Sequence, residues 1–175
     1  MVRFANRVTS IESSPTVRLG NLVTEMKARG ERVLSLSVGE PDFPTPAHIV
    51  EAGKKALDDG FTKYTSSVGI RELREAIAEK SVKENRIPAK PENVLVAPTK
   101  HALYMACMAL LEAGDEAIIP DPGWVSYGPM VVLAGARPVP VRAADEEGFV
   151  PTPDAIAELI TPRTRVILLN SPSNP

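Results

Sequence analysis

The chain has 175 residues, 43% of them hydrophobic and 24% charged, with a formal net charge of −2; this balance is typical of a globular protein with a hydrophobic core. There is no basic excess to neutralise nucleic-acid phosphates, so we expect no nucleic-acid partner. The apolar stretches are too short to span a bilayer and the N-terminus has no signal-peptide core, which predicts a cytoplasmic protein without a membrane partner. With Cys107 as the one cysteine beside His48 and His101, we expect neither a disulfide nor a zinc site.

The first predicted elements are a helix and a short strand. Ser14 is a capping residue and Pro15 follows it, as in the first turn of many helices. This predicts a helix over residues 16–28 that ends at Gly30. The alternation of residues 33–37 predicts a strand, and the proline-rich residues 39–46 form the loop after it.

Two amphipathic helices come next. Thr45 and Pro46 repeat the arrangement of a cap followed by proline, and a second helical pattern begins at residue 70. In both helices the apolar positions share one face: Ile49, Ala52 and Ala56 in the first, and Ile70, Leu73 and Ile77 in the second.

From residue 91 onwards, short strands and helices alternate. The periodicity predicts strands over 92–98, 115–120, 137–141 and 164–170, and helices over 99–114, 125–135 and 152–160. This alternation is typical of βαβ units around a parallel sheet with helices on both faces. The predicted fold class is therefore α/β, and ligands of such sheets bind beyond the carboxyl ends of the strands.

The loops after three predicted strands carry side chains suited to an aromatic ligand with a phosphate. Thr99 begins a helix, where free N–H groups favour an anion, although taken alone a threonine there is more often only a cap. Lys100 adds positive charge or extends into water. Trp124 offers a flat face to a planar ring, or packs as a core or lid residue. Asn170 and Asn174 bring amides that bind an anionic or phenolic oxygen, or serve turns.

The glycine-rich loops of dinucleotide dehydrogenases and P-loop NTPases do not occur in the sequence, which disfavours both classes. Five other motifs, in order and spacing, resemble the class I/II aminotransferases of aspartate aminotransferase type, which depend on pyridoxal phosphate (PLP): VGEPDFPTP, KYTSSVGIRELREAIA, APTKHALYMA, GDEAIIPDPGWVSY and NSPSNP. The resemblance implies the PLP fold type I, with residues 1–45 as an N-terminal arm and small-domain segment. Residues 46–175 would be the first part of the large PLP-binding α/β domain.

The resemblance also implies roles for the residues at the strand ends. Thr99 and Lys100 would form the turn that binds the PLP phosphate, and Trp124 would stack on the pyridine ring beside the substrate. Asn174 would bind the phenolic oxygen of the ring near the substrate carboxylate. Pro98 stands where the family usually has glycine, so one N–H donor is missing and Thr99 must begin the phosphate site.

Two further residues gain roles only through the resemblance. Tyr64 would reach across a homodimer interface to the partner's PLP phosphate, and Gly39 would lie against the bound amino acid. Without the resemblance they would be interpreted as a packed surface tyrosine and a turn glycine. Asp121–Pro122 and Asn174–Pro175 fall where the family often has cis prolyl bonds.

The resemblance implies that the Schiff-base lysine, an aspartate facing the pyridine nitrogen and an arginine for the substrate carboxylate lie beyond Pro175. None of the eight lysines has the family's context for that lysine: Lys27, Lys54, Lys55, Lys63, Lys80, Lys83, Lys90 and Lys100. We therefore assign no catalytic residue here and expect a chain truncated within its cofactor site and inactive alone. The full-length parent would move an amino group between an L-amino acid, aspartate or a broad range, and a 2-oxo acid.

Two alternatives stay open at this point. In the first, the chain is a catalytically inactive N-terminal fragment that serves as a dimerising or PLP-binding scaffold. PLP-dependent lyase chemistry on the same fold is disfavoured by the motifs GEPDF and YTSSVG, which are closer to those of transaminases.

Overall fold

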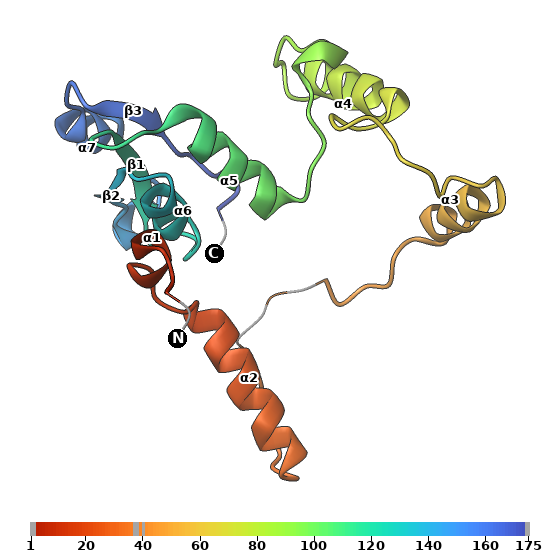
Figure 1. Cartoon of the computed structure of the whole chain (residues 1–175), viewed down its shortest axis with the longest axis horizontal. Helices are drawn as coiled ribbons and strands as arrows, with labels where there is room; N and C mark the ends of the chain where they lie inside the picture. The colour runs from red at the N-terminus through yellow and green to blue at the C-terminus, as the bar shows by residue number, and fades with distance from the viewer. Residues whose placement is uncertain (1–2, 37–38, 40, 174–175) are drawn as a thin grey trace. The chain divides into compact units, whose positions relative to one another are not determined.

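The structure is a computed structural model that describes residues 3–36, 39 and 41–173 (Figure 1). It contains two compact units, one formed by Met1–Ser37 with Thr99–Pro175 and the other by Val38–Pro98. The first unit holds α1 (Asn6–Thr9), α2 (Pro15–Ala28), α5 (Thr99–Leu110), β1 (Glu116–Asp121), α6 (Tyr127–Leu133), β2 (Arg137–Arg142), the 3-10 turn η2 (Asp145–Glu147), α7 (Pro153–Leu159) and β3 (Thr164–Ile167). The second unit holds α3 (Ala47–Asp58), α4 (Arg71–Lys83) and the 3-10 turn η1 (Pro91–Asn93).

The first unit is built around a parallel sheet in which β1 lies between β2 and β3. In the pairing of β1 with β2, Ala117 lies opposite Pro138 and Ile119 lies opposite Pro140. Helices connect the strands, as parallel pairing requires. The predicted α/β class with a parallel sheet is confirmed.

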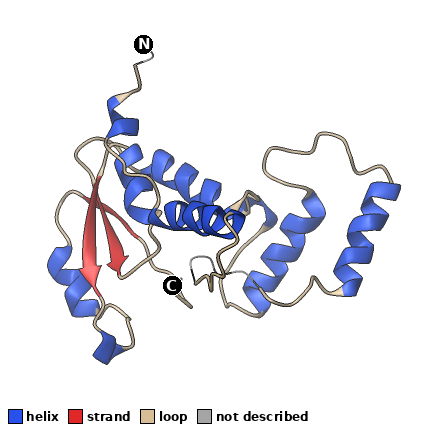
Figure 2. Cartoon of the chain, turned by 90° about the horizontal axis from the view of Figure 1, so that it is seen from below, coloured by secondary structure: helices blue, strands red, loops and turns tan. Residues whose placement is uncertain are grey.

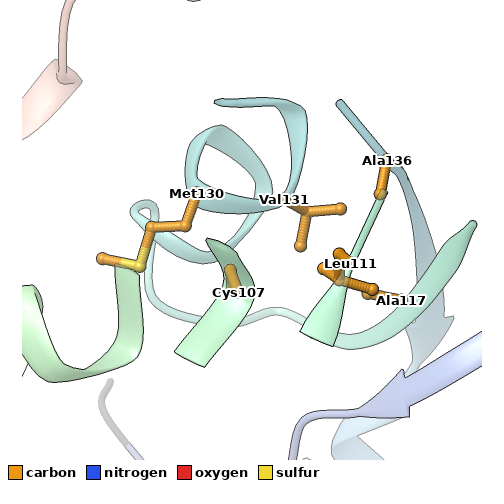
Figure 3. Close-up of a cluster of buried hydrophobic side chains, with 6 residues drawn as sticks. All are labelled: Cys107, Leu111, Ala117, Met130, Val131 and Ala136. Atoms are coloured by element: carbon orange, nitrogen blue, oxygen red, sulfur yellow. The ribbon is translucent and has the colours of Figure 1, made fainter. Parts of the chain in front are cut away.

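Different helices cover the two faces of the sheet (Figure 2). Successive side chains of a strand point to opposite faces, so Ala117 and Ile118 of β1 enter two separate clusters. Figure 3 shows the cluster that joins the sheet to α5 and α6: Cys107, Leu111, Ala117, Met130, Val131 and Ala136. On the other face, Ile118 is fully buried and packs with residues of β2 and α7: Val139, Val141, Ala155, Ile156 and Leu159. The prediction of helices on both faces is therefore confirmed.

Two of the predicted strands are not formed. Residues 33–36 have no strand structure, and Leu34 and Leu36 are 92% and 101% exposed; Ser37 lies outside the described residues. Residues 94–98 follow η1 without joining a sheet, and the N–H of Val96 donates to Val68 O at 3.0 Å. A strand needs a hydrogen-bonding neighbour. Local alternation predicts the extended shape but does not supply that neighbour, so both predictions were wrong.

Gly69 provides a test of packing in the second unit. Its φ is +100°, and a Cβ added there would lie 2.8 Å from the Cβ of Val96. We expect Gly69→Ala to lower the free energy of unfolding by about 2–4 kcal/mol, because backbone strain and overpacking add. Gly60→Ala is the matched control, since Gly60 has a φ of +80° with nothing within 4 Å. Chemical denaturation of the whole protein should show the larger loss at Gly69, and equal losses would contradict this account.

A buried carboxylate lies at the amino edge of the sheet. The side chain of Glu116 is 1% exposed, and its Oε1 accepts hydrogen bonds from Arg137 at 2.7 Å and from Arg163 Nε at 2.9 Å. Its Oε2 accepts a hydrogen bond from the Thr161 hydroxyl at 2.8 Å. The hydrogen bond from Arg137, then that from Thr161, and the charges of both arginines outweigh desolvation and lower the pKa of Glu116 to about 2. We call Glu116, Arg137, Thr161 and Arg163 the Glu116 cluster.

The lowered pKa of Glu116 predicts a window of acid sensitivity. The ionised carboxylate stabilises the fold above the ordinary pKa of 4.5, and this contribution is lost as the pH falls from 4.5 towards 2. We expect the unfolding free energy of the whole protein to fall across this window, and Glu116→Gln to flatten that part of the fall. Denaturation at about pH 6 and about pH 3 measures both. An unchanged pH dependence in Glu116→Gln would contradict the assignment.

Candidate functional site

The candidate site begins where β1 ends, at the carboxyl edge of the sheet. The Asp121–Pro122 bond is cis; the sequence left either isomer open at this position, where the family often has a cis prolyl bond. Gly123 follows in a close turn, in which an added Cβ would lie 2.4 Å from Pro120 O. Only glycine fits so near a backbone oxygen. This turn sets the direction in which the chain presents the next residue, Trp124.

The indole of Trp124 contacts two side chains. The Lys100 ammonium lies over the ring, 5.0 Å from its centroid, which is within the range of a cation–π interaction. The Tyr127 ring meets it edge-on, with centroids 5.6 Å apart and an interplanar angle of 83°. Tyr127 is buried, and this burial raises the pKa of its phenol. Trp124 itself is partly buried against the cluster of Figure 3, so its ring is positioned by packing on the α5 and α6 side.

Thr99 and Lys100 form the beginning of α5, a helix of 12 residues. The N–H groups of a first helical turn have no acceptors within the helix and carry the positive end of its dipole. No acidic residue lies in this turn, and Lys100 adds a cation there. The position therefore favours an anion such as a phosphate.

A groove of about 700 Å³ runs beside this helix end. Residues 11–15 line one part of it, and Lys100, Tyr104, Met130 and Leu133 line another. Its lining is mainly apolar, and its charged residues are Glu12 and Lys100. Such a space suits a ligand with an apolar portion.

The structure brings Thr99, Lys100 and Trp124 into one region, but it leaves the other predicted site residues untested. Tyr64 is fully exposed in the second unit, and Gly39 has nothing within 4 Å of an added Cβ. Asn174, and with it the Asn174–Pro175 bond, lies outside the described residues. The roles of these residues stay predictions.

Asn170 is half-buried and follows β3. Because β1 and β3 are parallel, the loop after β3 leaves the same edge of the sheet as the loop that carries Trp124. The Ser171–Pro172 bond in that loop is also cis, at a position where no cis bond was expected from the sequence.

Two contributors to the region were missed by reasoning from sequence. Tyr127 lies three residues after Trp124, a spacing at which aromatic side chains can meet where a helix begins. Gly123 stands between a proline and the tryptophan, and this position could have indicated a close turn. Both signals are local and were available in the motif DPGWVSY.

Other kinds of site find no support in the described part of the chain. No group of three or more His, Cys, Asp or Glu side chains among those residues is arranged to hold a metal ion. Across residues 3–36, 39 and 41–173, no helix has both the length and the apolar character needed to cross a bilayer.

Comparison with known proteins places these features in context. The family described as "Aminotransferase class I and II" matches residues 31–175. The chain is 46% identical over 172 residues to a "Probable aspartate/prephenate aminotransferase" of Thermus aquaticus, covering 98% of this chain and 45% of that protein. It is 44% identical over 175 residues to an "Aspartate aminotransferase" of Geobacillus stearothermophilus, covering 99% of this chain and 44% of that protein.

A solved structure shows the same likeness in three dimensions. The aspartate aminotransferase of Thermus thermophilus, solved with maleate, superposes with a TM-score of 0.95 at 43% identity. The match covers 100% of this chain and 46% of that chain. The chain thus spans a little under half the length of the relatives that it matches.

Proposed function

This chain belongs to the class I and II aminotransferases, and on that premise we propose that the whole protein is a PLP-dependent transaminase. It would move an amino group between an L-amino acid and a 2-oxo acid. The observation that carries the proposal is the convergence of Thr99, Lys100 and Trp124 at the carboxyl edge of the sheet. Aspartate is the first amino donor to try, because two of the relatives carry it in their names; a broader range of amino acids is the alternative.

The residues of the site fit the two ends of PLP. The first-turn N–H groups of α5 and the Thr99 hydroxyl would donate hydrogen bonds to the phosphate, with Lys100 adding positive charge. Trp124 would stack on the pyridine ring through a face of its indole. When bound, PLP supplies the electron sink that stabilises the charge left after α-proton loss.

Lys100 is not the residue we assign to proton transfer. Its ammonium lies over the Trp124 ring, at the end of the site that would hold the phosphate. We assign no catalytic residue within this chain, and propose that Lys100 binds and orients. Asn174 would bind the phenolic oxygen, and Gly39 would lie against the substrate.

We propose a homodimer in which Tyr64 contacts the partner's phosphate site. In support, the phenol of Tyr64 is fully exposed and therefore accessible to a second molecule. Tyr64→Phe should weaken PLP binding without changing the stability of the second unit. Unchanged PLP affinity in a confirmed dimer would count against this role.

The wider organisation follows the same proposal. Residues 1–45 would belong to an N-terminal arm and small domain, and residues 46–175 to the large PLP-binding domain. We propose a cytoplasmic location for the whole protein, in which amino and 2-oxo acids are its small-molecule partners.

The test uses the whole protein, meaning this chain with any sequence that flanks it. Its intact mass is measured first and compared with the 18.8 kDa of this chain. The protein is then given PLP, freed of excess cofactor, and assayed for amino transfer from aspartate to a 2-oxo acid. Retained PLP with transfer supports the proposal. Retained PLP without transfer to any 2-oxo acid supports the PLP-binding scaffold. Absence of retained PLP contradicts the transaminase and leaves only the dimerising scaffold.

A further inference from the structure

The pairing of β3 with β1 contains an irregularity beside Glu116. Glu116 pairs with Thr164, but the next residue, Ala117, pairs with Val166, and the register shifts between the two pairs. Arg165 is therefore an extra residue in β3, as in a β-bulge. The bulge determines the register of all later residues of the strand.

Charged side chains hold this bulge from both sides. The Glu116 carboxylate binds Arg163 and Thr161, which precede β3, and the Glu116 N–H donates to Arg163 O at 2.9 Å. The Arg165 guanidinium, on the extra residue, donates to Asp115 Oδ1 at 3.3 Å. Asp115 and Glu116, at the start of β1, thus bind residues before the bulge and the extra residue within it.

The register matters because a slip of one residue would reverse the faces of β3. Val166 now packs on the α5 and α6 side with Ala117, and Leu168 N–H extends the pairing by donating to Ile118 O at 2.9 Å. A slip would turn Val166 to the opposite face and move the following loop by about 3.3 Å along the strand.

We propose that the Glu116 cluster sets the position of the loop that follows β3 by fixing the register of that strand. Glu116 is then a positioning residue, at the opposite edge of the sheet from Trp124. The loop after β3 contains Asn170, and the predicted PLP ligand Asn174 follows it in the sequence. This functional meaning rests on the proposed function, whereas the effect on register does not.

The structure offers two variants that separate the contacts of Glu116. Arg163→Ala removes the side-chain contact to the chain before β3, and Arg137→Ala removes the contact to β2. The amide of Leu168 reports on the pairing of β1 with β3, and the amide of Ala143, which donates to Asp121 O at 2.8 Å, reports on the pairing of β1 with β2. Hydrogen exchange of both amides is measured in the whole protein.

We expect Arg163→Ala to speed exchange at Leu168 by about 10-fold or more, with a clearly smaller change at Ala143. Arg137→Ala should not show this preference for Leu168. Val139→Ala, in the cluster on the α7 face, controls for general loss of stability, because it removes packing without touching the Glu116 cluster. Equal changes at the two amides in Arg163→Ala would overturn the proposal and leave the cluster as a source of overall stability.

PLP binding of the same variants separates this inference from the proposed function. Selective exchange at Leu168 with weakened PLP binding in Arg163→Ala supports both. Selective exchange in a protein whose unaltered form binds no PLP supports the register effect and removes the proposed function. PLP binding by the unaltered protein, without selective exchange in Arg163→Ala, supports the proposed function and removes the register effect.

Discussion

Replacing Trp124 with alanine is expected to weaken PLP binding by the whole protein by up to about 10-fold, since ring stacking contributes about 0.5–1.5 kcal/mol beyond buried area. The substitution removes the ring on which the pyridine would stack. It also removes the surface over which the Lys100 ammonium lies, 5.0 Å from the ring centroid. The measurement is equilibrium dialysis of PLP against the unaltered protein and the variant.

Trp124→Phe is the matched control for this experiment. It keeps an aromatic face and the packing against Tyr127, so we expect most of the PLP affinity to remain. Because Trp124 is partly buried against the core, the unfolding free energy of both variants is measured as well. PLP affinity unchanged in a folded Trp124→Ala protein would remove Trp124 from the site.

Gly123→Ala is expected to have a large effect on both stability and PLP binding. The new Cβ would meet Pro120 O at 2.4 Å and Pro120 C at 3.2 Å, and these backbone atoms belong to β1 and cannot rotate away. Relief requires the turn to shift, which moves Trp124. We expect a loss of about 1–3 kcal/mol in unfolding free energy. We also expect weaker PLP binding by the protein that remains folded, because Trp124 has moved.

Gly128→Ala provides the comparison for the same chemical change nearby. An added Cβ at Gly128 would lie 3.9 Å from Ile119 Cδ1, which is an ordinary contact. Gly128 is in α6, where alanine favours the helix by about 0.5–1 kcal/mol over glycine. We therefore expect unchanged or higher stability and unchanged PLP affinity. Equal behaviour of the two variants in denaturation and dialysis would show that the Gly123 turn is not constrained.

The sequence was informative where structure depends on local pattern. The strands now seen as β1 and β2 were predicted almost to the residue, because apolar runs between helices indicate buried parallel strands. Residues 33–36 and 94–98 share a strand-like composition but form no strand, and a partner strand is not a local property of the sequence.

In the candidate site, too, some features follow from the local sequence and others depend on tertiary packing. Trp124 could be found from its place after the strand now seen as β1, and Thr99 from its place at the start of a predicted helix. The contact between Lys100 and Trp124 depends on how α5 packs beside the loop. The Glu116 cluster was not predicted at all. Its arginines lie 21 and 47 residues away from Glu116, so no local window contains the cluster.

The pairing of β2 has a consequence for growth of the sheet. Arg137 and Ala143 direct their N–H groups to β1, so the alternate positions Pro138 and Pro140 face outward. Proline has no N–H, and the outer edge of β2 therefore lacks two of the donors that an added strand would need. This edge is protected against association with strands of other molecules. Any further strand of the sheet is expected to add beside β3.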